Sequence, residues 1–344
     1  MTAPVAKRMG WGLVGVGRHA ERFIVPAMGK SASGQLVGVF SRDMGRARQL
    51  AERLGCPLAT DSIDALVEDA RIHAVYVCSP NNVHKDQVVR AAKAGKHVLC
   101  EKPLATNARD SLTMVEACRQ AGVKLGVGFH LRHNPVHMAA KESVRSGVLG
   151  TIQLAEVQYM HVTAGSEGRR QSVAWRRDPI MAGGGSFMST GVHAIDLLRF
   201  VTGKEITQVL ALADEEWRSS GIERLIQVSM VVEGDTLASA SAGPMKHPLN
   251  HLVLYGASAT LRCTGSIGNN GGGSIEIVSD DGTQIRRFDT CDVYEHELDA
   301  FADSVRNGTE PSASGYDALR VAQIAEGVYE SLRTGRAVPL PADL

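Results

Sequence analysis

A lysine with chemical potential lies at the end of a short apolar run in the 344-residue sequence. Lys102 follows His97–Cys100, which is typical of a buried parallel strand, and it precedes Pro103. Proline restricts the backbone of the residue before it, so we expect Lys102 to be held in place, and a cis Lys102–Pro103 bond is compatible with the sequence. An ammonium group beyond a strand end is placed to touch a ligand and to stabilise negative charge on an oxygen. The alternative is an ordinary lysine in a surface salt bridge.

A glycine motif near the start of the chain indicates what the sheet binds. Residues Gly15–Ala20 read Gly-Val-Gly-Arg-His-Ala and follow the apolar strand Trp11–Gly15. This is a form of the dinucleotide-binding fingerprint, in which the first glycine allows a tight turn and the second lets a pyrophosphate approach the backbone. The following helix, expected to reach about Gly29, would offer its free N–H groups to phosphate.

The residues after the second strand, Leu36–Phe40, bear on the choice of cofactor. A ribose with a free 2′-hydroxyl usually meets an Asp or Glu there, but here the residues are Ser41 and Arg42, with Arg46 one helical turn later. A hydroxyl and guanidinium groups suit a 2′-phosphate, which favours NADP over NAD. Alternatively, Ser41 caps the next helix, and Asp43 leaves NAD open.

The first part of the chain alternates strands with helices. Such alternation predicts a parallel, doubly wound sheet, so Ser79, Asn81 and Lys102 should emerge at the same rim as Gly15 and Gly17. The expected strands are Trp11–Gly15, Leu36–Phe40, Ala74–Cys78, Lys96–Cys100 and Leu125–Phe129, and the expected helices are Asp43–Leu54, Ile63–Glu68, Val83–Ala94 and Asn107–Ala121.

Three motifs together resemble the Gfo/Idh/MocA family, which includes glucose–fructose oxidoreductase, inositol dehydrogenase and 1,5-anhydrofructose reductase. They are the glycine motif, Ser79-Pro80-Asn81 with His84, and Ala94–Pro103 with its Glu-Lys-Pro ending. The resemblance runs from about Met9 to about Leu340. It implies a Rossmann domain over residues 1–130 and an α+β domain over residues 131–344, whose C-terminal helix could pack back on the first domain.

The second half of the sequence is rich in strands. Strands in series predict a large, mostly antiparallel sheet, and the resemblance implies that the sheet is open, with an exposed face that builds a homodimer or homotetramer. The expected strands are Ile152–Met160, Ile206–Ala213, Leu225–Val232, Thr236–Ala242, Leu252–Tyr255 and Ile275–Val278, with one intervening helix at about Thr190–Val201 and two closing helices at Val293–Arg306 and Tyr316–Arg333.

The resemblance also identifies His193 as the acid/base residue. It follows the glycine run Gly183–Gly185 on a helix, where the family has Asp-x-x-x-His, but the Asp position here is Ser189. Residues four apart on an α-helix share a face. A serine hydroxyl can orient the imidazole but supplies no charge, and Asp196 could partly substitute for the missing acid.

Further site residues follow from the resemblance. Trp175 and Arg176 would contact the cofactor, or would form only a surface stack. Tyr294 would face the substrate, or would be a core tyrosine. The predicted cofactor-contacting residues are Gly15, Gly17, Arg18, His19, Ser41, Arg42, Arg46, Ser79, Asn81, His84, Glu101, Lys102, Arg132, Trp175 and Arg176. The predicted substrate-contacting residues are Lys102, His130, Ser189, His193 and Tyr294.

Composition and spacing argue against other classes. Lys plus Arg equals Asp plus Glu at 37 each, so the sequence has no electrostatic footprint for nucleic acid or a membrane surface. The six cysteines are scattered and the start of the chain lacks an apolar leader core, which predicts reduced thiols and a cytoplasmic location. His130, His133 and His137 could approach one another, but Pro135 interrupts their spacing, so we expect no metal site.

The sequence therefore predicts an NADP-preferring oxidoreductase that acts on a secondary alcohol or ketone of a sugar, cyclitol or related cyclic polyol. Lys102 would bind the reacting oxygen, His193 would exchange the proton, and Glu101 would position Lys102. Two alternatives stay open within the same family: a glycosidase that holds NAD and oxidises its substrate transiently, and a non-catalytic sugar or cofactor sensor.

Overall fold

The computed structural model describes residues 8–162 and 174–341. The chain divides into two compact units, which we treat separately. The first contains Met1–Leu104, Asp110–Gly128 and Tyr294–Gly315, and the second contains Ala105–Arg109, Phe129–Val293 and Tyr316–Leu344. The expected division placed Tyr294–Gly315 in the second domain, whereas these residues cluster with the first unit. In the described ranges, no helix is both long and apolar enough to span a bilayer.

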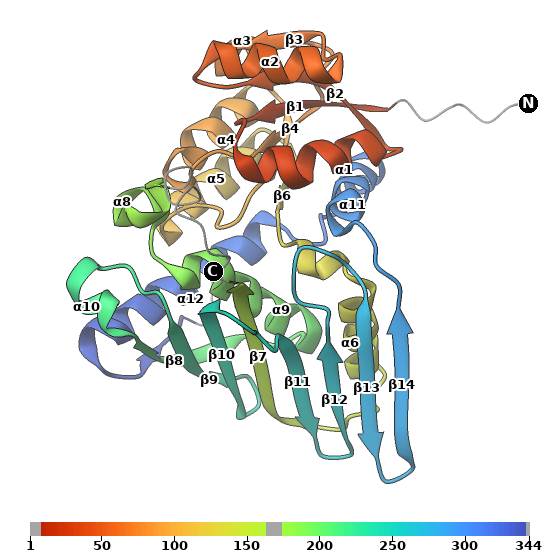
Figure 1. The fold of residues 1–344 in the computed structure, drawn as a ribbon, viewed down its shortest axis with the longest axis vertical. Coiled ribbons are helices and arrows are strands. Elements are labelled where there is room, and N and C mark those ends of the chain that lie inside the picture. Colours follow the sequence, from red (N-terminus) through yellow and green to blue (C-terminus); the bar gives the residue numbers. More distant parts are fainter. Residues whose placement is uncertain (1–7, 163–173, 342–344) are drawn as a thin grey trace, which may run out of the picture. The chain divides into compact units, whose positions relative to one another are not determined.

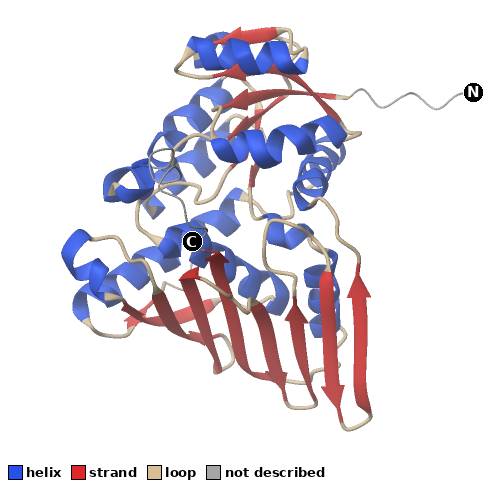
Figure 2. Cartoon of the chain, in the orientation of Figure 1, coloured by secondary structure: helices blue, strands red, loops and turns tan. Residues whose placement is uncertain are grey.

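The first unit is built on a six-stranded parallel sheet in the order β3-β2-β1-β4-β5-β6 (Figures 1 and 2). The predicted doubly wound fold is thus confirmed, and the sequence missed only the three-residue strand β3. The strands are β1 (Met9–Val14), β2 (Gly34–Phe40), β3 (Leu58–Thr60), β4 (Ala74–Val77), β5 (His97–Cys100) and β6 (Leu125–Val127). The helices are η1 (Ala20–Ile24), α1 (Val25–Lys30), α2 (Met44–Leu54), α3 (Ile63–Glu68), η2 (Asn81–Val83), α4 (His84–Lys93), α5 (Ala108–Gln120) and α11 (Val293–Asn307).

Helix α11 joins this unit through side-chain packing and the sheet edge. The ring of Phe301 lies 5.6 Å from the ring of the buried Trp11 in β1. A Cβ atom at Gly126 in β6 would approach the Phe301 ring to 2.6 Å, so only glycine lets the helix pack this closely. After the helix, the Ala313 carbonyl accepts a hydrogen bond from the Val127 N–H. The unit therefore takes part of its core from a segment about 170 residues further along the chain.

The second unit is built on a nine-stranded sheet in the order β14-β13-β12-β11-β7-β10-β9-β8-β15 (Figure 1). Its pairs are antiparallel except β7 with β10, which confirms the predicted mostly antiparallel sheet. The strands are β7 (Ile152–Val162), β8 (Ile206–Ala213), β9 (Ile226–Val232), β10 (Thr236–Met245), β11 (His251–Gly256), β12 (Ala259–Thr264), β13 (Gly273–Ser279), β14 (Gly282–Phe288) and β15 (Val338–Pro339). The helices are η3 (His130–His133), α6 (Pro135–Arg145), η4 (Ala174–Arg177), α8 (Pro179–Ala182), η5 (Phe187–Gly191), α9 (Val192–Thr202), α10 (Glu215–Ser220) and α12 (Gly315–Thr334).

Helices α6 and α9 pack on one face of this sheet. Strands β7, β9 and β10 alternate buried and more exposed residues, as expected when only one face is covered. The expectation of a single helix between the strands was wrong, because the short helices α8 and α10 also lie there. Each is capped by Asp and glycine residues that a search for long apolar periodicity overlooks.

Candidate active site

The glycine loop after β1 combines a tight turn with an open backbone. Gly15 has φ +101°, and a Cβ atom there would lie 2.9 Å from the Cys78 carbonyl oxygen, so this position requires glycine. A Cβ atom at Gly17 would meet only that same carbonyl, at 3.9 Å. Glycine therefore leaves open a space that a larger side chain would fill. A pyrophosphate needs this space to approach the backbone. The loop fits a dinucleotide.

The residues after β2 have different roles from those that the sequence predicts. Asp43, rather than Ser41, is the N-cap of α2, and its Oδ1 accepts the N–H groups of Gly45 and Arg46. Ser41 Oγ accepts the Asp43 N–H at 3.2 Å. The Arg46 guanidinium donates to the Val16 carbonyl of the glycine loop at 2.5 Å. Arg46 is thus anchored beside the predicted dinucleotide site, while Asp43 has an oxygen engaged in its own helix.

His84 connects two loops at the carboxyl ends of β4 and β5. Its Nε2 lies 2.9 Å from the Ser79 carbonyl, and its Nδ1 lies 3.2 Å from both the Pro103 and Leu104 carbonyls. The side chain is completely buried, and burial lowers its pKa. The resemblance predicts that this ring contacts the cofactor. The structure instead places it beneath the surface, where it holds the loop carrying Ser79 and Asn81 against the turn at Pro103.

Lys102 lies in that turn, directly after β5. The Lys102–Pro103 bond is cis, as the sequence allowed. The Lys102 side chain is partly exposed, whereas Glu101 and Pro103 on either side are buried. The lysine is therefore the residue of this motif that reaches the surface of the unit.

Glu101 is the centre of a buried polar group. Its Oε1 accepts the hydroxyl of Tyr76 at 2.8 Å and lies 2.9 Å from Nε2 of His19, while its Oε2 accepts the Lys102 main-chain N–H at 3.2 Å. Burial by itself raises the pKa of this carboxyl, but His19, the Lys102 ammonium and the Tyr76 hydroxyl together lower it to about 2. Glu101 is thus an ionised carboxylate that fixes the main chain of Lys102.

Tyr294 packs as an aromatic core residue of the first unit. Its ring stacks on Phe23 at 5.2 Å and meets the edge of His19 at 5.5 Å, and its side chain is 2% exposed. These contacts favour the core alternative over the predicted substrate contact. Arg18, by contrast, is exposed beside the glycine loop, where the sequence expected a cofactor-contacting residue.

In the second unit, the glycine run is dictated by packing. A Cβ atom at Gly184 would lie 1.8 Å from the Tyr329 hydroxyl, and one at Gly185 would lie 2.0 Å from the Glu223 carbonyl oxygen. The Glu223 carboxylate accepts the N–H groups of Gly185 and Phe187 and the Tyr329 hydroxyl. This buried carboxylate therefore anchors the start of the helical segment that leads to His193.

That segment is not a single α-helix. Residues Phe187–Gly191 form a π-helical turn in which the Val192 N–H donates to the Phe187 carbonyl, and α9 begins only at Val192. The prediction that Ser189 and His193 share a face assumed α-helical spacing throughout, and it stays a prediction. Ser189 is half-buried and His193 is 3% exposed.

His193 lies among aromatic rings. The ring of His130 meets it edge to face at 4.6 Å, and the rings of Phe129 and Tyr159 each lie 5.8 Å away. Nε2 of His130 lies 3.0 Å from the Gly268 carbonyl and donates to it, which leaves Nδ1 as the acceptor in the neutral ring. The two histidines thus form a close pair that the sequence analysis did not anticipate.

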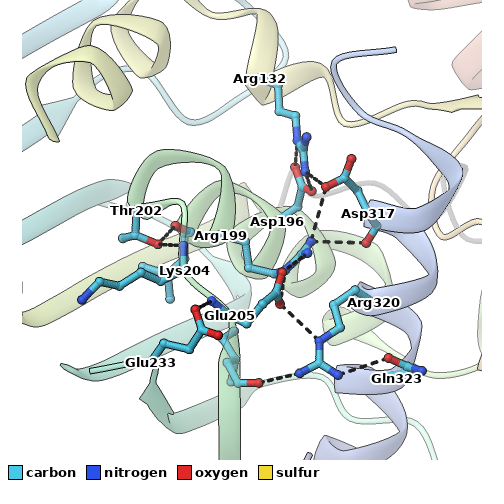
Figure 3. Close-up of polar contacts among 12 residues, drawn as sticks. Arg132, Asp196, Arg199, Thr202, Lys204, Glu205, Glu233, Asp317, Arg320 and Gln323 are labelled. Carbon is cyan, nitrogen blue, oxygen red and sulfur yellow. Dashed lines mark hydrogen bonds and ion pairs between the residues drawn. The ribbon is translucent and has the colours of Figure 1, made fainter. Parts of the chain in front are cut away.

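Arg132 belongs to a buried ionic cluster, which corrects two expectations (Figure 3). Its guanidinium binds both oxygens of Asp196, at 2.8 and 2.6 Å, and lies 3.1 Å from Asp317. With its side chain 5% exposed, Arg132 is engaged inside the protein instead of presented to a cofactor. Asp196 is likewise committed to Arg132, so the expectation that it substitutes for the missing acid beside His193 was wrong. The pair fastens η3 to α9, the elements that carry His130 and His193.

The remaining predicted residues are placed as follows. The Arg176 guanidinium lies 5.4 Å from the centre of the Trp175 ring, the stacking geometry named as the alternative to cofactor contact. His137 is buried, with Nδ1 2.8 Å from the Leu131 carbonyl and Nε2 3.0 Å from Ser266 Oγ. Within residues 8–162 and 174–341, no cluster of three or more His, Cys, Asp or Glu is arranged to hold a metal.

Sequence reasoning missed Tyr76 and Glu223. Tyr76 lies within an apolar strand, where a tyrosine is an ordinary core residue, and Glu223 lies in a loop with no motif. Nothing in either local sequence indicates the polar partners, because those partners come from distant segments.

Comparison with known proteins agrees with this arrangement. Residues 9–129 match the family described as "Oxidoreductase family, NAD-binding Rossmann fold", and residues 137–262 match the "GFO/IDH/MocA C-terminal domain". The chain is 28% identical to a 1,5-anhydro-D-fructose reductase of Ensifer adhaerens, covering 97% of this chain and 99% of the relative. It is 29% identical to a myo-inositol 2-dehydrogenase of Thermotoga maritima, covering 96% and 98%. The crystal structure of an aldose–aldose oxidoreductase from Caulobacter crescentus superposes with a TM-score of 0.88 at 25% identity, covering 97% and 100%.

Proposed function

Because the chain belongs to the Gfo/Idh/MocA family of oxidoreductases, we propose that it interconverts a secondary alcohol and a ketone on a sugar, cyclitol or related cyclic polyol. The observation that carries this proposal is the turn after β5, where the partly exposed Lys102 is fixed by the buried Glu101 carboxylate. The relatives named above as a sugar reductase and an inositol dehydrogenase support the substrate class.

The proposed roles follow from the chemistry of each side chain. A nicotinamide cofactor supplies or accepts the hydride when bound. Lys102 donates a hydrogen bond to the reacting oxygen and stabilises the negative charge that develops there. His193 gives the proton to that oxygen or takes it away, as an imidazole does near neutral pH. Glu101 stays ionised and holds the Lys102 backbone in place.

For the cofactor, we propose a preference for NADP. Arg46 is tied to the Val16 carbonyl, and Arg42, four residues earlier in the sequence, is exposed; two guanidinium groups suit a 2′-phosphate. Asp43 would otherwise favour a free 2′-hydroxyl, but it caps α2. Since a hydrogen bond to a charged group is worth about 1.5–3 kcal/mol, R46Q should weaken NADPH binding by about tenfold or more while leaving NADH binding unchanged. Fluorescence titration measures both constants, and R48Q, an exposed arginine on the same helix, is the control.

Removal of the lysine tests the reaction itself. With a panel of sugars and cyclitols and the absorbance of NADPH as the readout, K102M should lower kcat by about 10²-fold or more, because the reacting oxygen loses its charged donor. Binding of NADPH should persist. K93M, at an exposed position on α4, should behave as wild type. Turnover by K102M at the wild-type rate would remove the lysine from the mechanism.

The role of His193 is tested by the pH dependence of the rate. H193A should lose the dependence on the imidazole, and S189D should shift it, because a carboxylate near the ring favours the imidazolium. If the pH–rate profile were unchanged in both variants, His193 would not be the acid/base residue.

We also propose that the chain self-associates through the open face of its nine-stranded sheet. The register aligns Leu237 of β10 with Leu154 of β7, and Leu154 with Tyr255 of β11, and these side chains are 58%, 36% and 37% exposed. Val278 of β13, 44% exposed, lies in the same row beyond Thr260 of β12. A groove of about 920 Å³ lies on strands β11 to β13. Large exposed apolar side chains aligned across neighbouring strands are typical of an interface.

A further inference from the structure

We propose that Glu297 and Tyr76 are positioning residues: a protonated Glu297 donates to the Tyr76 hydroxyl, which donates to the Glu101 carboxylate and so fixes the turn that carries Lys102. All the residues that form these hydrogen bonds belong to the first unit. Its effect on turnover rests on the function proposed above.

The three groups form a continuous buried chain. The Tyr76 hydroxyl lies 2.8 Å from Oε1 of Glu101 and 3.4 Å from Oε2 of Glu297. Tyr76 is fully buried, Glu297 is 2% exposed and Glu101 is 8% exposed. They come from β4, α11 and the turn directly after β5, so three segments meet at one hydroxyl. The last hydrogen bond of the series is the one that the main-chain N–H of Lys102 donates to Glu101.

The number of protons decides the direction of the hydrogen bonds. Tyr76 has one proton and two carboxyl neighbours, and the shorter distance assigns that proton to Glu101. The tyrosine oxygen then faces Glu297 as an acceptor, and only a protonated carboxyl can donate to it. The other oxygen of Glu297, Oε1, is buried without a hydrogen-bond partner, which a carboxylate would tolerate poorly and a neutral acid tolerates better.

The surroundings of the two carboxyl groups also favour an ionised Glu101 and a protonated Glu297. Glu101 faces the His19 ring and the Lys102 ammonium, which favour its charge. Glu297 faces Tyr76 and the negative Glu101, and burial together with that charge raises its pKa well above the usual value. Cys78 is the other titratable group beside Tyr76. Two buried carboxyls that share one hydroxyl thus hold one negative charge between them.

Helix α11 contributes to both ends of this chain. Glu297 is one helical turn after Tyr294, whose ring meets the edge of His19. The same helix therefore places the proton donor of Tyr76 and supports the imidazole that faces Glu101.

The protonation state can be tested without any substrate. Infrared spectroscopy at neutral pH should show the band of a protonated carboxyl in the wild-type protein, and E297Q should lack it. E68Q, at an exposed position, should keep the band. A wild-type protein without the band, or an E297Q protein that retains it, would overturn the proposal whatever the activity.

The positioning role is tested by kinetics. Y76F and E297L break the chain, so each should lower kcat by about tenfold with little change in the KM for NADPH, and should move the acid limb of the pH profile towards neutral pH. E297Q keeps an N–H donor for Tyr76 and should recover most of the loss seen in E297L. Equal losses in E297Q and E297L, or an unmoved acid limb in Y76F, would refute the role. Y316F, at an exposed tyrosine, is the control. If the infrared result is as expected but no sugar or cyclitol is turned over, the proposed function fails, whereas the hydrogen bonds from protonated Glu297 through Tyr76 to Glu101 remain supported.

Discussion

Buried ionisable side chains in this protein are held in one protonation state by their immediate neighbours. Glu101 is ionised because His19, the Lys102 ammonium and the Tyr76 hydroxyl lower its pKa, and burial lowers the pKa of His84 although the carbonyl groups at its ring raise it. Such states cannot be predicted from the sequence, because the decisive neighbours are distant in the chain. What the sequence did indicate was the type of each residue and its place at a strand end, which is enough to nominate Lys102 but not to find Tyr76.

His137 gives a prediction about stability and pH. Burial lowers its pKa to about 4 from the unfolded value of about 6.5, so between these values the unfolded chain binds the extra proton. The free energy of unfolding should therefore fall as the pH drops from 6.5 to 4, and the loss should reach roughly 3 kcal/mol at pH 4. Above pH 6.5 the ring is neutral in both states, so none of this stability is lost. Urea unfolding at a series of pH values measures the slope.

The variants for that experiment separate His137 from other groups. H137N removes the titrating ring and should flatten the slope over this pH range, although it also lowers stability overall. H247N, at an exposed histidine, should leave the slope as in wild type. The same slope in H137N and wild type would show that the ring is not the source.

At the scale of elements, the segment that precedes His193 shows what sequence patterns do not predict. The glycine run was recognised from the sequence, but its reason, close packing against Tyr329 and Glu223, involves residues 38 and more than 140 positions away. The sequence analysis did not predict the π-helical turn at Phe187–Gly191.

The Arg132–Asp196 pair between η3 and α9 yields a prediction at this scale. Replacing Arg132 with Met should strand Asp196 as a buried unpaired charge and lower the free energy of unfolding by about 3–5 kcal/mol. The double variant R132M/D196L removes both charges and should recover a large part of that loss. R145M breaks an exposed pair and should cost less than about 1 kcal/mol. If R132M were as mild as R145M in urea unfolding, the buried pair would not be what fastens the two elements.

At the scale of the whole molecule, the sequence predicted both sheets but not how the chain is shared between the units. Alternating strands and helices were sufficient for the parallel sheet, and strands in series for the antiparallel one. The return of α11 to the first unit was not predictable, since its apolar face would suit either core. The contacts that decide it, Phe301 against Trp11 and Gly126, have no signature in the local sequence.

The open face of the nine-stranded sheet is the feature of the second unit that its own fold leaves unexplained. Leu237, Leu154 and Tyr255 are aligned across neighbouring strands and exposed, an arrangement that costs free energy unless a second copy covers it. At micromolar concentration, light scattering should therefore find a dimer or tetramer of the wild-type chain. L237D places a charge in the row and should yield folded monomers, since the side chain is 58% exposed in the single chain. L112D, at an exposed leucine on α5, should keep the wild-type mass. A monomeric wild-type protein, or an L237D protein of undiminished size, would mean that this face serves some other purpose.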